Sequence, residues 1–167
     1  DIQLAGRLYP SARGSLQDDY YIFVDDTSST SQYISTNADG WLTQNSYDLA
    51  ERYLSTDALQ PGELVMVGTG AVSVQRTTGA DVIPLGIVST KPGFLLGRMA
   101  TNTYPIALAG RVPTKVTGDI QIGDEIGPSD IPGVATKSDG SNRVVGIALE
   151  THTGNDIGYI EVFVKNG

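Results

Sequence analysis

The residues best suited to chemistry are few and widely separated. The single histidine, His152, lies in an acidic loop between Glu150 and Asp156. A metal site needs several His, Asp, Glu or Cys ligands close together, so a lone histidine in such a loop is more simply a surface turn residue. The pair Asp25-Asp26 and the segment 138–142 carry oxygen ligands that calcium accepts, but neither has the spacing of a helical calcium-binding loop. We therefore expect no metal site and no cofactor.

Catalytic patterns are equally weak. Serines and threonines are plentiful, but no Gly-x-Ser-x-Gly segment places a serine at a strand-to-helix turn. Asp48, Glu51, Asp124 and Glu125 are candidates for a paired-carboxylate site, yet the sequence does not give their separation in space. The segment 68–70 (Gly-Thr-Gly) lacks the third glycine and the following helix of a phosphate-binding loop. These observations predict a protein that is not an enzyme.

Composition limits the partners. The chain has 167 residues, with 11 Lys and Arg against 19 Asp and Glu, a formal net charge of -8 and no cysteine. No basic stripe is present that could follow a phosphate backbone, so nucleic acid is not expected as a partner. No apolar run reaches the length of a membrane span, and the N-terminus lacks the layout of a signal peptide, so an exported form would be a processed one. The acidic, Thr-, Ser- and Gly-rich composition favours an extracellular or cell-surface location.

The first part of the chain, residues 1–44, is expected to be an extended β arm or a small meander. Strands are predicted at 20–24 and 32–36, and the segment 37–40 suits a hairpin turn. The N-terminal arm has an alternating pattern without an evident local partner, and its apolar residues are Ile2, Leu4, Leu8 and Tyr9. Such a strand either pairs within its own domain or adds to the sheet of a second copy.

The second part, residues 45–167, is expected to be an all-β domain, a compact barrel or sandwich. Residues 45–54 are compatible with a short helix capped by Ser46, but also with an extended strand. From Leu59 onward, short β-branched runs alternate with Gly, Pro and Asp turns at the spacing of a barrel or sandwich.

One motif is used twice, which predicts an internal pseudo-repeat. The segments 59–65 and 85–88 are echoed about sixty positions later by the segments 120–126 and 145–148. In each copy a turn glycine, Gly62 or Gly123, leads into a strand. A second glycine, Gly86 or Gly146, lies inside an apolar run, where a bulge or a close backbone approach is needed; a ligand contact is the alternative.

Several motifs in order also resemble a known module. They are residues 47–53, 59–65, 85–93, 105–116, 145–150 and 160–164. The chain resembles the C-terminal β-rich head module of large bacterial surface proteins and of phage tail-fibre and tailspike-like proteins. The resemblance implies a β-rich head at the end of a fibre, often trimeric in the phage relatives. A more distant similarity to the autoproteolytic C-terminal domains of tailspikes rests on the Asp48–Glu51 and Gly86–Ser89 stretches.

These features lead to one main hypothesis and two alternatives. We expect an extracellular structural protein that associates with copies of itself, as a subunit or head of a surface fibre. The first alternative is an autoproteolytic intramolecular chaperone for fibre assembly. The second is a module that binds cell-surface glycans, for which Trp41 and the tyrosines offer stacking faces.

Overall fold

The chain is all-β in every part that the structure describes. A computed structural model describes the strand backbones 20–24 and 32–36 and residues 47–98, 100–140 and 143–165. None of these residues is helical, and none forms a helix able to cross a membrane. The prediction of an all-β fold is therefore confirmed. The chain divides into two compact units, Asp1–Gln44 and Asn45–Gly167, and each is described by itself.

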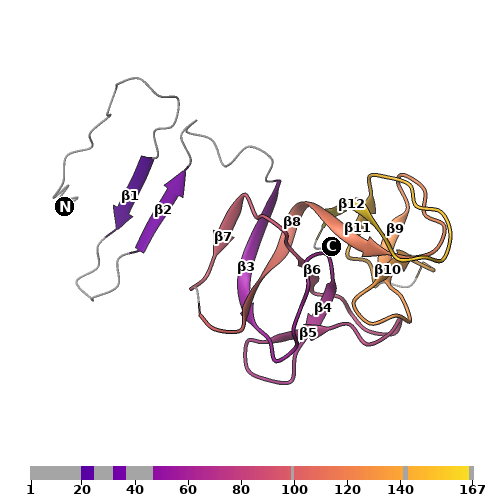
Figure 1. The fold of residues 1–167 in the computed structure, drawn as a ribbon, viewed down its shortest axis with the longest axis horizontal. Helices are drawn as coiled ribbons and strands as arrows, with labels where there is room; N and C mark the ends of the chain where they lie inside the picture. The colour runs from indigo at the N-terminus through magenta and orange to yellow at the C-terminus, as the bar shows by residue number, and fades with distance from the viewer. Residues whose placement is uncertain (1–19, 25–31, 37–46, 99, 141–142, 166–167) are drawn as a thin grey trace. The chain divides into compact units, whose positions relative to one another are not determined.

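The described residues of the first unit form one antiparallel hairpin. Strands β1 (Tyr20–Val24) and β2 (Gln32–Thr36) pair along their whole length, with Tyr20 opposite Thr36 (Figure 1). Alternating β-branched and aromatic residues favour this extended backbone. The arm residues Ile2, Leu4, Leu8 and Tyr9, and also Trp41, lie outside the described residues.

The second unit contains ten strands in one continuous sheet. Their bounds are β3 (Asp48–Leu54), β4 (Leu64–Val67), β5 (Val74–Arg76), β6 (Gly86–Val88), β7 (Phe94–Leu96), β8 (Thr103–Val116), β9 (Glu125–Pro128), β10 (Ala135–Lys137), β11 (Gly146–Ala148) and β12 (Gly158–Val164). The helix weighed for residues 45–54 is wrong over β3. Buried Asp48 and Ala50 alternate there with exposed Leu49, a period of two that suits a strand.

Five of these strands, in the spatial order β8, β12, β11, β9 and β10, close into a barrel. Strand β8 pairs with β12, β12 with β11, β11 with β9 and β9 with β10. The pairing of Ala135 with Val116 returns β10 to β8 and closes the circle. We call this the C-terminal barrel. Closure removes the free sheet edges that would otherwise need a partner.

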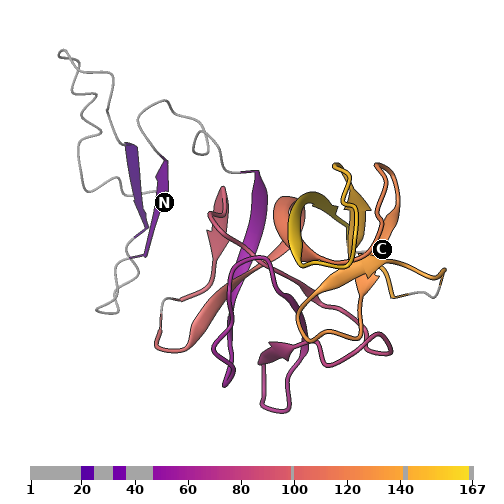
Figure 2. The same ribbon diagram turned by 45° about the vertical axis from the view of Figure 1, so that its right-hand side comes forward.

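The remaining strands form a second circuit that shares β8. The first half of β8 pairs with β3 and β6, β6 with β4, and β4 with β5. An isolated bridge between Leu54 and Ser73 links the end of β3 to the chain just before β5. We call this the N-terminal ring. Figures 1 and 2 show the two halves side by side along the long strand β8, with β7 added outside β3.

The ring and the barrel are two copies of one arrangement, as the sequence echo indicates. Strands β4, β5 and β6 pair with one another as β9, β10 and β11 do. The matched register pairs are Val65–Gly86 with Ile126–Gly146, and Val65–Arg76 with Ile126–Lys137. The same hydrogen bonds recur, from Gly62 N to Val88 O (2.8 Å) and from Gly123 N to Ala148 O (2.9 Å).

Each copy has its own apolar core. The larger core cluster lies mainly in the barrel and consists of Leu64, Ile87, Ala107, Val112, Val116, Ile120, Ile126, Ala135, Val145, Ala148, Ile160, Val162 and Val164. The smaller cluster, in the ring, consists of Leu59, Val65, Val74, Val88 and Ile106. Burial of these side chains is the main favourable contribution to folding, because the chain has no cysteine and so no disulfide.

Candidate functional site

The four glycines singled out in the sequence take two kinds of position. Gly62 and Gly123 are turn residues with φ of +81° and +91°, which L side chains rarely adopt. A Cβ at Gly62 would also lie 2.8 Å from a ring carbon of Tyr159 and 3.0 Å from the carbonyl oxygen of Pro113. A Cβ at Gly123 would meet nothing. The first turn is therefore fixed by packing against β8 and β12, and the second by backbone conformation alone.

Gly86 and Gly146 lie where two strands approach closely. A Cβ at Gly86 would come within 2.5 Å of the carbonyl oxygen of Ala107, and one at Gly146 would meet the carbonyl oxygen of Phe163. The space that a side chain would need is therefore filled by the neighbouring strand. Both positions serve strand packing, and neither lines a ligand pocket that the structure describes.

A buried polar pair lies at the start of β3. Asp48 is 7% exposed and Ser89 is 3% exposed. The Asp48 Oδ2 and Ser89 Oγ atoms are buried without a hydrogen-bond partner among the described residues. Burial raises the pKa of Asp48, although the nearby Ser89 hydroxyl and the Gly93 backbone partly oppose this. The neutral acid is thus favoured more than at an ordinary aspartate.

Two further carboxylates lie near this pair. Glu161, on β12, donates its backbone N–H to Glu150 Oε2 at 2.9 Å. Burial raises the pKa of Glu161, the charges of Glu150 and Asp48 add to the rise, and Arg111 opposes it. The Arg111 guanidinium stacks over the ring of Tyr47 at 4.0 Å. This junction of Asp48, Glu150, Glu161 and Arg111 was not predicted from the sequence, because its members come from three strands and a loop.

A second charged cluster joins the ring to the barrel. Glu63 is 6% exposed, and its carboxylate lies 3.0 Å from Arg76 Nε and 3.1 Å from Lys115 Nζ. Gln60 N also donates to Glu63 Oε2 at 3.0 Å. The equivalent ion pair in the barrel joins Asp124 to Lys137 at 2.8 Å. In both cases the carboxylate links a turn to a neighbouring strand, so we interpret these ion pairs as structural contacts.

The metal candidates weighed in the sequence fall in ordinary structural settings. His152 donates its Nδ1–H to the carbonyl oxygen of Gly118 at 2.8 Å, and its other edge packs against Gly158. The segment 138–142 is described only to residue 140, and Asp25-Asp26 lies outside the described residues. The described part of the chain contains no group of three or more His, Asp or Glu residues placed to hold a metal ion.

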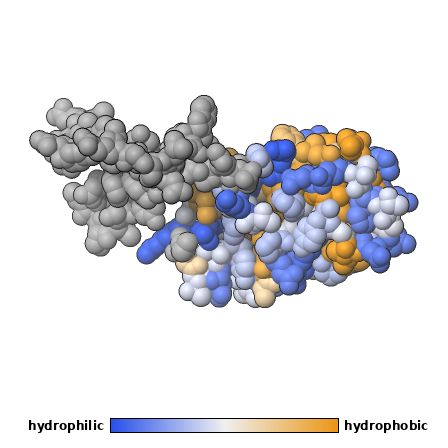
Figure 3. All heavy atoms as spheres, turned by 45° about the horizontal axis from the view of Figure 1, so that its top comes forward, coloured by the Kyte–Doolittle hydropathy of each residue, from blue (hydrophilic) through white to orange (hydrophobic). Residues whose placement is uncertain are grey.

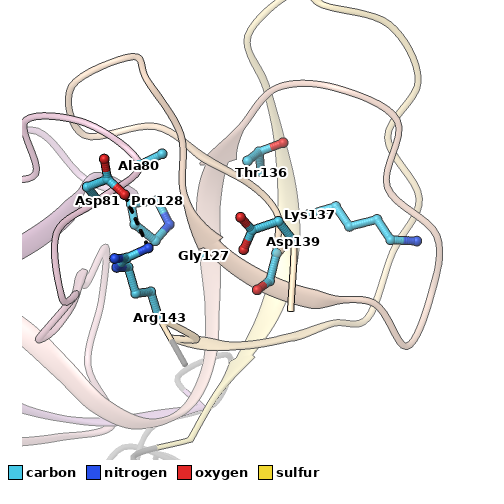
Figure 4. A pocket seen from close by; sticks show the side chains of 9 residues that line it. Ala80, Asp81, Gly127, Pro128, Thr136, Lys137, Asp139 and Arg143 are labelled. Atoms are coloured by element: carbon cyan, nitrogen blue, oxygen red, sulfur yellow. Dashed lines mark ion pairs between the residues drawn. The ribbon is translucent and has the colours of Figure 1, made fainter. Parts of the chain in front are cut away.

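One shallow hollow lies between the two halves, near β9 and β10 (Figure 4). It has a volume of about 110 Å³ and is lined by Ala80, Asp81, Gly127, Pro128, Thr136, Lys137, Ser138, Asp139 and Arg143. Arg143 and Asp81 form an ion pair of 3.3 Å across it, and the Lys137 side chain points away. Ligand pockets commonly begin at roughly 300 Å³. The hollow is therefore a poor candidate for a substrate site.

A further candidate surface is the outer face of the sheet. Register pairs and contacts connect neighbouring side chains across it, from Ile147 to Phe163 and from Phe163 to Arg111, which stacks on Tyr47. Leu49 follows on β3 beside Phe94 of the edge strand β7. We call the six residues Ile147, Phe163, Tyr47, Leu49, Phe94 and Leu96 the outer band. Figure 3 shows hydrophobic areas in orange interspersed with hydrophilic ones in blue on the face that it draws.

The outer band is more exposed than a buried sheet face. Phe163 is 45% exposed, Tyr47 53% and Leu96 42%. Exposed apolar side chains that follow one another across a sheet mark a surface that can bind a partner, whereas scattered ones carry no such meaning. Beyond β7 the sheet has no further strand among the described residues, so the band ends at an open edge.

Comparisons with known proteins place the fold. No family model matches the sequence, and no curated protein matches it. The C-terminal fragment of bacteriophage phi29 gene product 12 superposes with a TM-score of 0.57 at 17% identity, covering 71% of this chain and 100% of that chain. The pre-mature bacteriophage phi29 gene product 12 gives a TM-score of 0.59 at 16% identity, covering 72% of this chain and 22% of that one. The chain thus matches about a fifth of the longer neighbour, and the likeness at these identities is one of fold. It has the fold of that phage protein's C-terminal fragment.

Proposed function

We propose that this chain is a structural, virion-associated protein, the C-terminal head of a fibre-like tail component that associates with copies of itself. The observation that carries the proposal is the shared fold with the C-terminal fragment of phi29 gene product 12, a phage tail appendage. The exposed outer band supports it, since a head that works alone would gain little from apolar side chains on a sheet face. In this proposal the chain works outside the cell and is not an enzyme.

The proposal is tested by the mass of the native particle. We expect size-exclusion chromatography with light scattering to give a multiple of the 17.6 kDa chain mass, and electron micrographs to show discrete heads or fibres. A monomer at every concentration, down to the lowest salt and up to the highest protein load, would refute self-association. Because surface contacts of this kind weaken on dilution, the measurement is made across a dilution series.

The N-terminal arm is the candidate element for strand addition. Ile2, Leu4, Leu8 and Tyr9 supply the apolar alternation that such a strand needs. Deleting residues 1–10 is expected to lower the oligomer mass if the arm pairs with a second copy. An unchanged mass assigns the arm to its own unit and leaves self-association to other surfaces.

A second candidate function is self-cleavage, and one observation favours it. Asp48 and Ser89 belong to the two motifs that carry the similarity to autoproteolytic tailspike domains, and they lie together, buried. A serine hydroxyl beside a carboxyl is one arrangement for nucleophilic attack on a peptide bond, when the carboxyl is ionised and can accept the hydroxyl proton. Intact-mass spectrometry of the chain, and of any longer polypeptide that extends before Asp1, should then show fragments that disappear in Ser89→Ala. An intact polypeptide after prolonged incubation would remove this candidate.

A further inference from the structure

The outer band has opposite charges at its two ends. At the barrel end, Glu161 precedes Phe163 by two residues on the same outward face of β12, and Glu150 lies beside it through the Glu161 N–H contact. Glu125 on β9, the exposed register partner of Ile147, is a third carboxylate at this end. Two described cations lie at this end: Arg111, whose guanidinium stacks on Tyr47, and exposed Lys165, two residues after Phe163. Three carboxylates, those of Glu125, Glu150 and Glu161, against these two cations leave this end with an excess of negative charge.

The other end of the band is basic. Strand β7 is flanked by Lys91 before it and Arg98 after it, and both side chains are exposed. Neither forms an ion pair with another residue in the described part of the chain. Strand β3, beside β7, carries two acids: Glu51 accepts a hydrogen bond from the Tyr53 hydroxyl at 2.8 Å, and Asp48 is buried. Figure 1 shows β7 on one side of the second unit, with β11 and β12 toward the other.

Opposite charges at the two ends of the outer band favour a head-to-tail contact between copies of the chain. A surface with one sign of charge at each end repels itself when two identical ends meet, and attracts when the acidic end of one copy meets the basic end of the next. A head-to-tail contact uses two different patches of each subunit and closes into a ring when the rotation between neighbours allows it. The apolar residues between the ends supply the burial that surface ion pairs alone do not give.

We propose that the outer band is the contact surface between copies of this chain, with the Glu150–Glu161 end of one copy against the Lys91–Arg98 end of the next. This inference rests on the proposed self-association and names the surface that carries it. The band's exposed apolar side chains become buried in the contact. Lys91 and Arg98 of one copy then lie opposite the carboxylates of the next copy.

The test is a charge exchange in the full chain. Glu161→Lys and Lys91→Glu each place like charges across the contact, and each is expected to raise the concentration of half-dissociation by about tenfold or more. The double variant Glu161→Lys with Lys91→Glu restores opposite charges and is expected to recover the wild-type oligomer. Asp156→Lys is the matched control, since it makes the same charge change at an exposed position outside the band. Light scattering over a dilution series measures all four variants, and far-UV circular dichroism checks that each is folded.

A second pair of variants tests the apolar part. Phe163→Lys lies within the band, whereas Ile83→Lys changes a side chain that is 76% exposed and lies outside it. We expect the first to dissociate the oligomer and the second to leave it intact. Because both positions are exposed, both variants are expected to fold.

The outcomes separate this inference from the proposed function. An oligomeric wild type whose mass is unchanged in Glu161→Lys, Lys91→Glu and Phe163→Lys overturns the inference and leaves self-association standing through another surface. Weakened single variants without recovery in the double variant overturn the head-to-tail pairing of these two ends. A wild type that stays monomeric at all concentrations overturns the proposed self-association, and the inference falls with it.

Discussion

Glu63 offers the sharpest test of how the ring and the barrel are held together. Its carboxylate is buried and contacts Arg76 on β5 at 3.0 Å and Lys115 on the barrel half of β8 at 3.1 Å. The Lys115 side chain is only 13% exposed, so it depends on Glu63 for charge compensation. Glu63→Gln keeps the shape of the side chain and removes its charge. We expect this variant to be clearly less stable than the wild type.

The expected loss of stability in Glu63→Gln depends on how deeply Arg76 and Lys115 are buried. Removing one member of a buried ion pair costs about 3–5 kcal/mol, because a charge is left buried without compensation. Arg76 is 31% exposed, and Lys115 keeps a hydrogen bond of 2.7 Å to Gln60 Oε1, so part of the cost is relieved. We therefore expect a loss of roughly 2–3 kcal/mol in the free energy of unfolding at neutral pH. Asp124→Asn is the matched control, since its partner Lys137 is 54% exposed and water already screens that pair.

The pH dependence gives an independent check of the same reasoning. Burial works against the charge of Glu63, but the Gln60 N–H, Arg76 and Lys115 outweigh it, and the pKa of Glu63 lies below its usual value. A carboxyl with a lowered pKa stabilises the folded state above its unfolded pKa, and this contribution disappears as the pH falls through the folded pKa. The difference between wild type and Glu63→Gln should therefore be largest near neutral pH and shrink in acid.

Urea unfolding followed by circular dichroism measures this difference at several pH values. The slope of the unfolding free energy against urea should stay the same in both variants, because a change in slope reports a change in the unfolded state. A loss in Glu63→Gln no larger than in Asp124→Asn would refute the idea that Glu63 links the two halves. A gap that is independent of pH would refute its electrostatic origin.

Two further predictions concern Asp48 and the core glycines. Because burial raises the pKa of Asp48, its charge opposes folding above that pKa, and the penalty is relieved as the pH falls through it. Asp48→Asn, which removes the charge, should therefore raise the melting temperature at neutral pH and have less effect in acid. A lower melting temperature at neutral pH would contradict this. Gly146→Ala should cost about 2–3 kcal/mol, since the new methyl group meets the Phe163 carbonyl oxygen. Gly123→Ala should cost about 1 kcal/mol, from backbone conformation alone, and equal losses measured by urea unfolding would contradict the packing argument for Gly146.

Local sequence signals were enough for the fold class and for the repeat. The strands 20–24 and 32–36 follow from runs of β-branched and aromatic residues, and the structure gives them the same bounds. The paired glycine motifs near Gly62 and Gly123 predict two related halves, because turn glycines and apolar alternation are properties of neighbouring residues. The resemblance to phage fibre modules agrees with the fold of phi29 gene product 12.

The tertiary structure alone decided which strands meet. Strand β8 contains Pro105 and Pro113, residues that usually mark a strand edge or end, yet it runs unbroken and is shared by the ring and the barrel. Residues 48–54 became a strand instead of a helix because β7 and β8 pair with them from far along the chain.

The candidate surfaces likewise could not be predicted from local sequence patterns. Asp48, Ser89 and Glu161 are far apart in the sequence, and only strand pairing brings them to one junction. The outer band likewise joins residues of four strands, β3, β7, β11 and β12, with Tyr47, which directly precedes β3. Periodicity in a sequence reports which side chains share a face of one strand, but the order of strands in a sheet depends on long-range contacts that no local pattern contains.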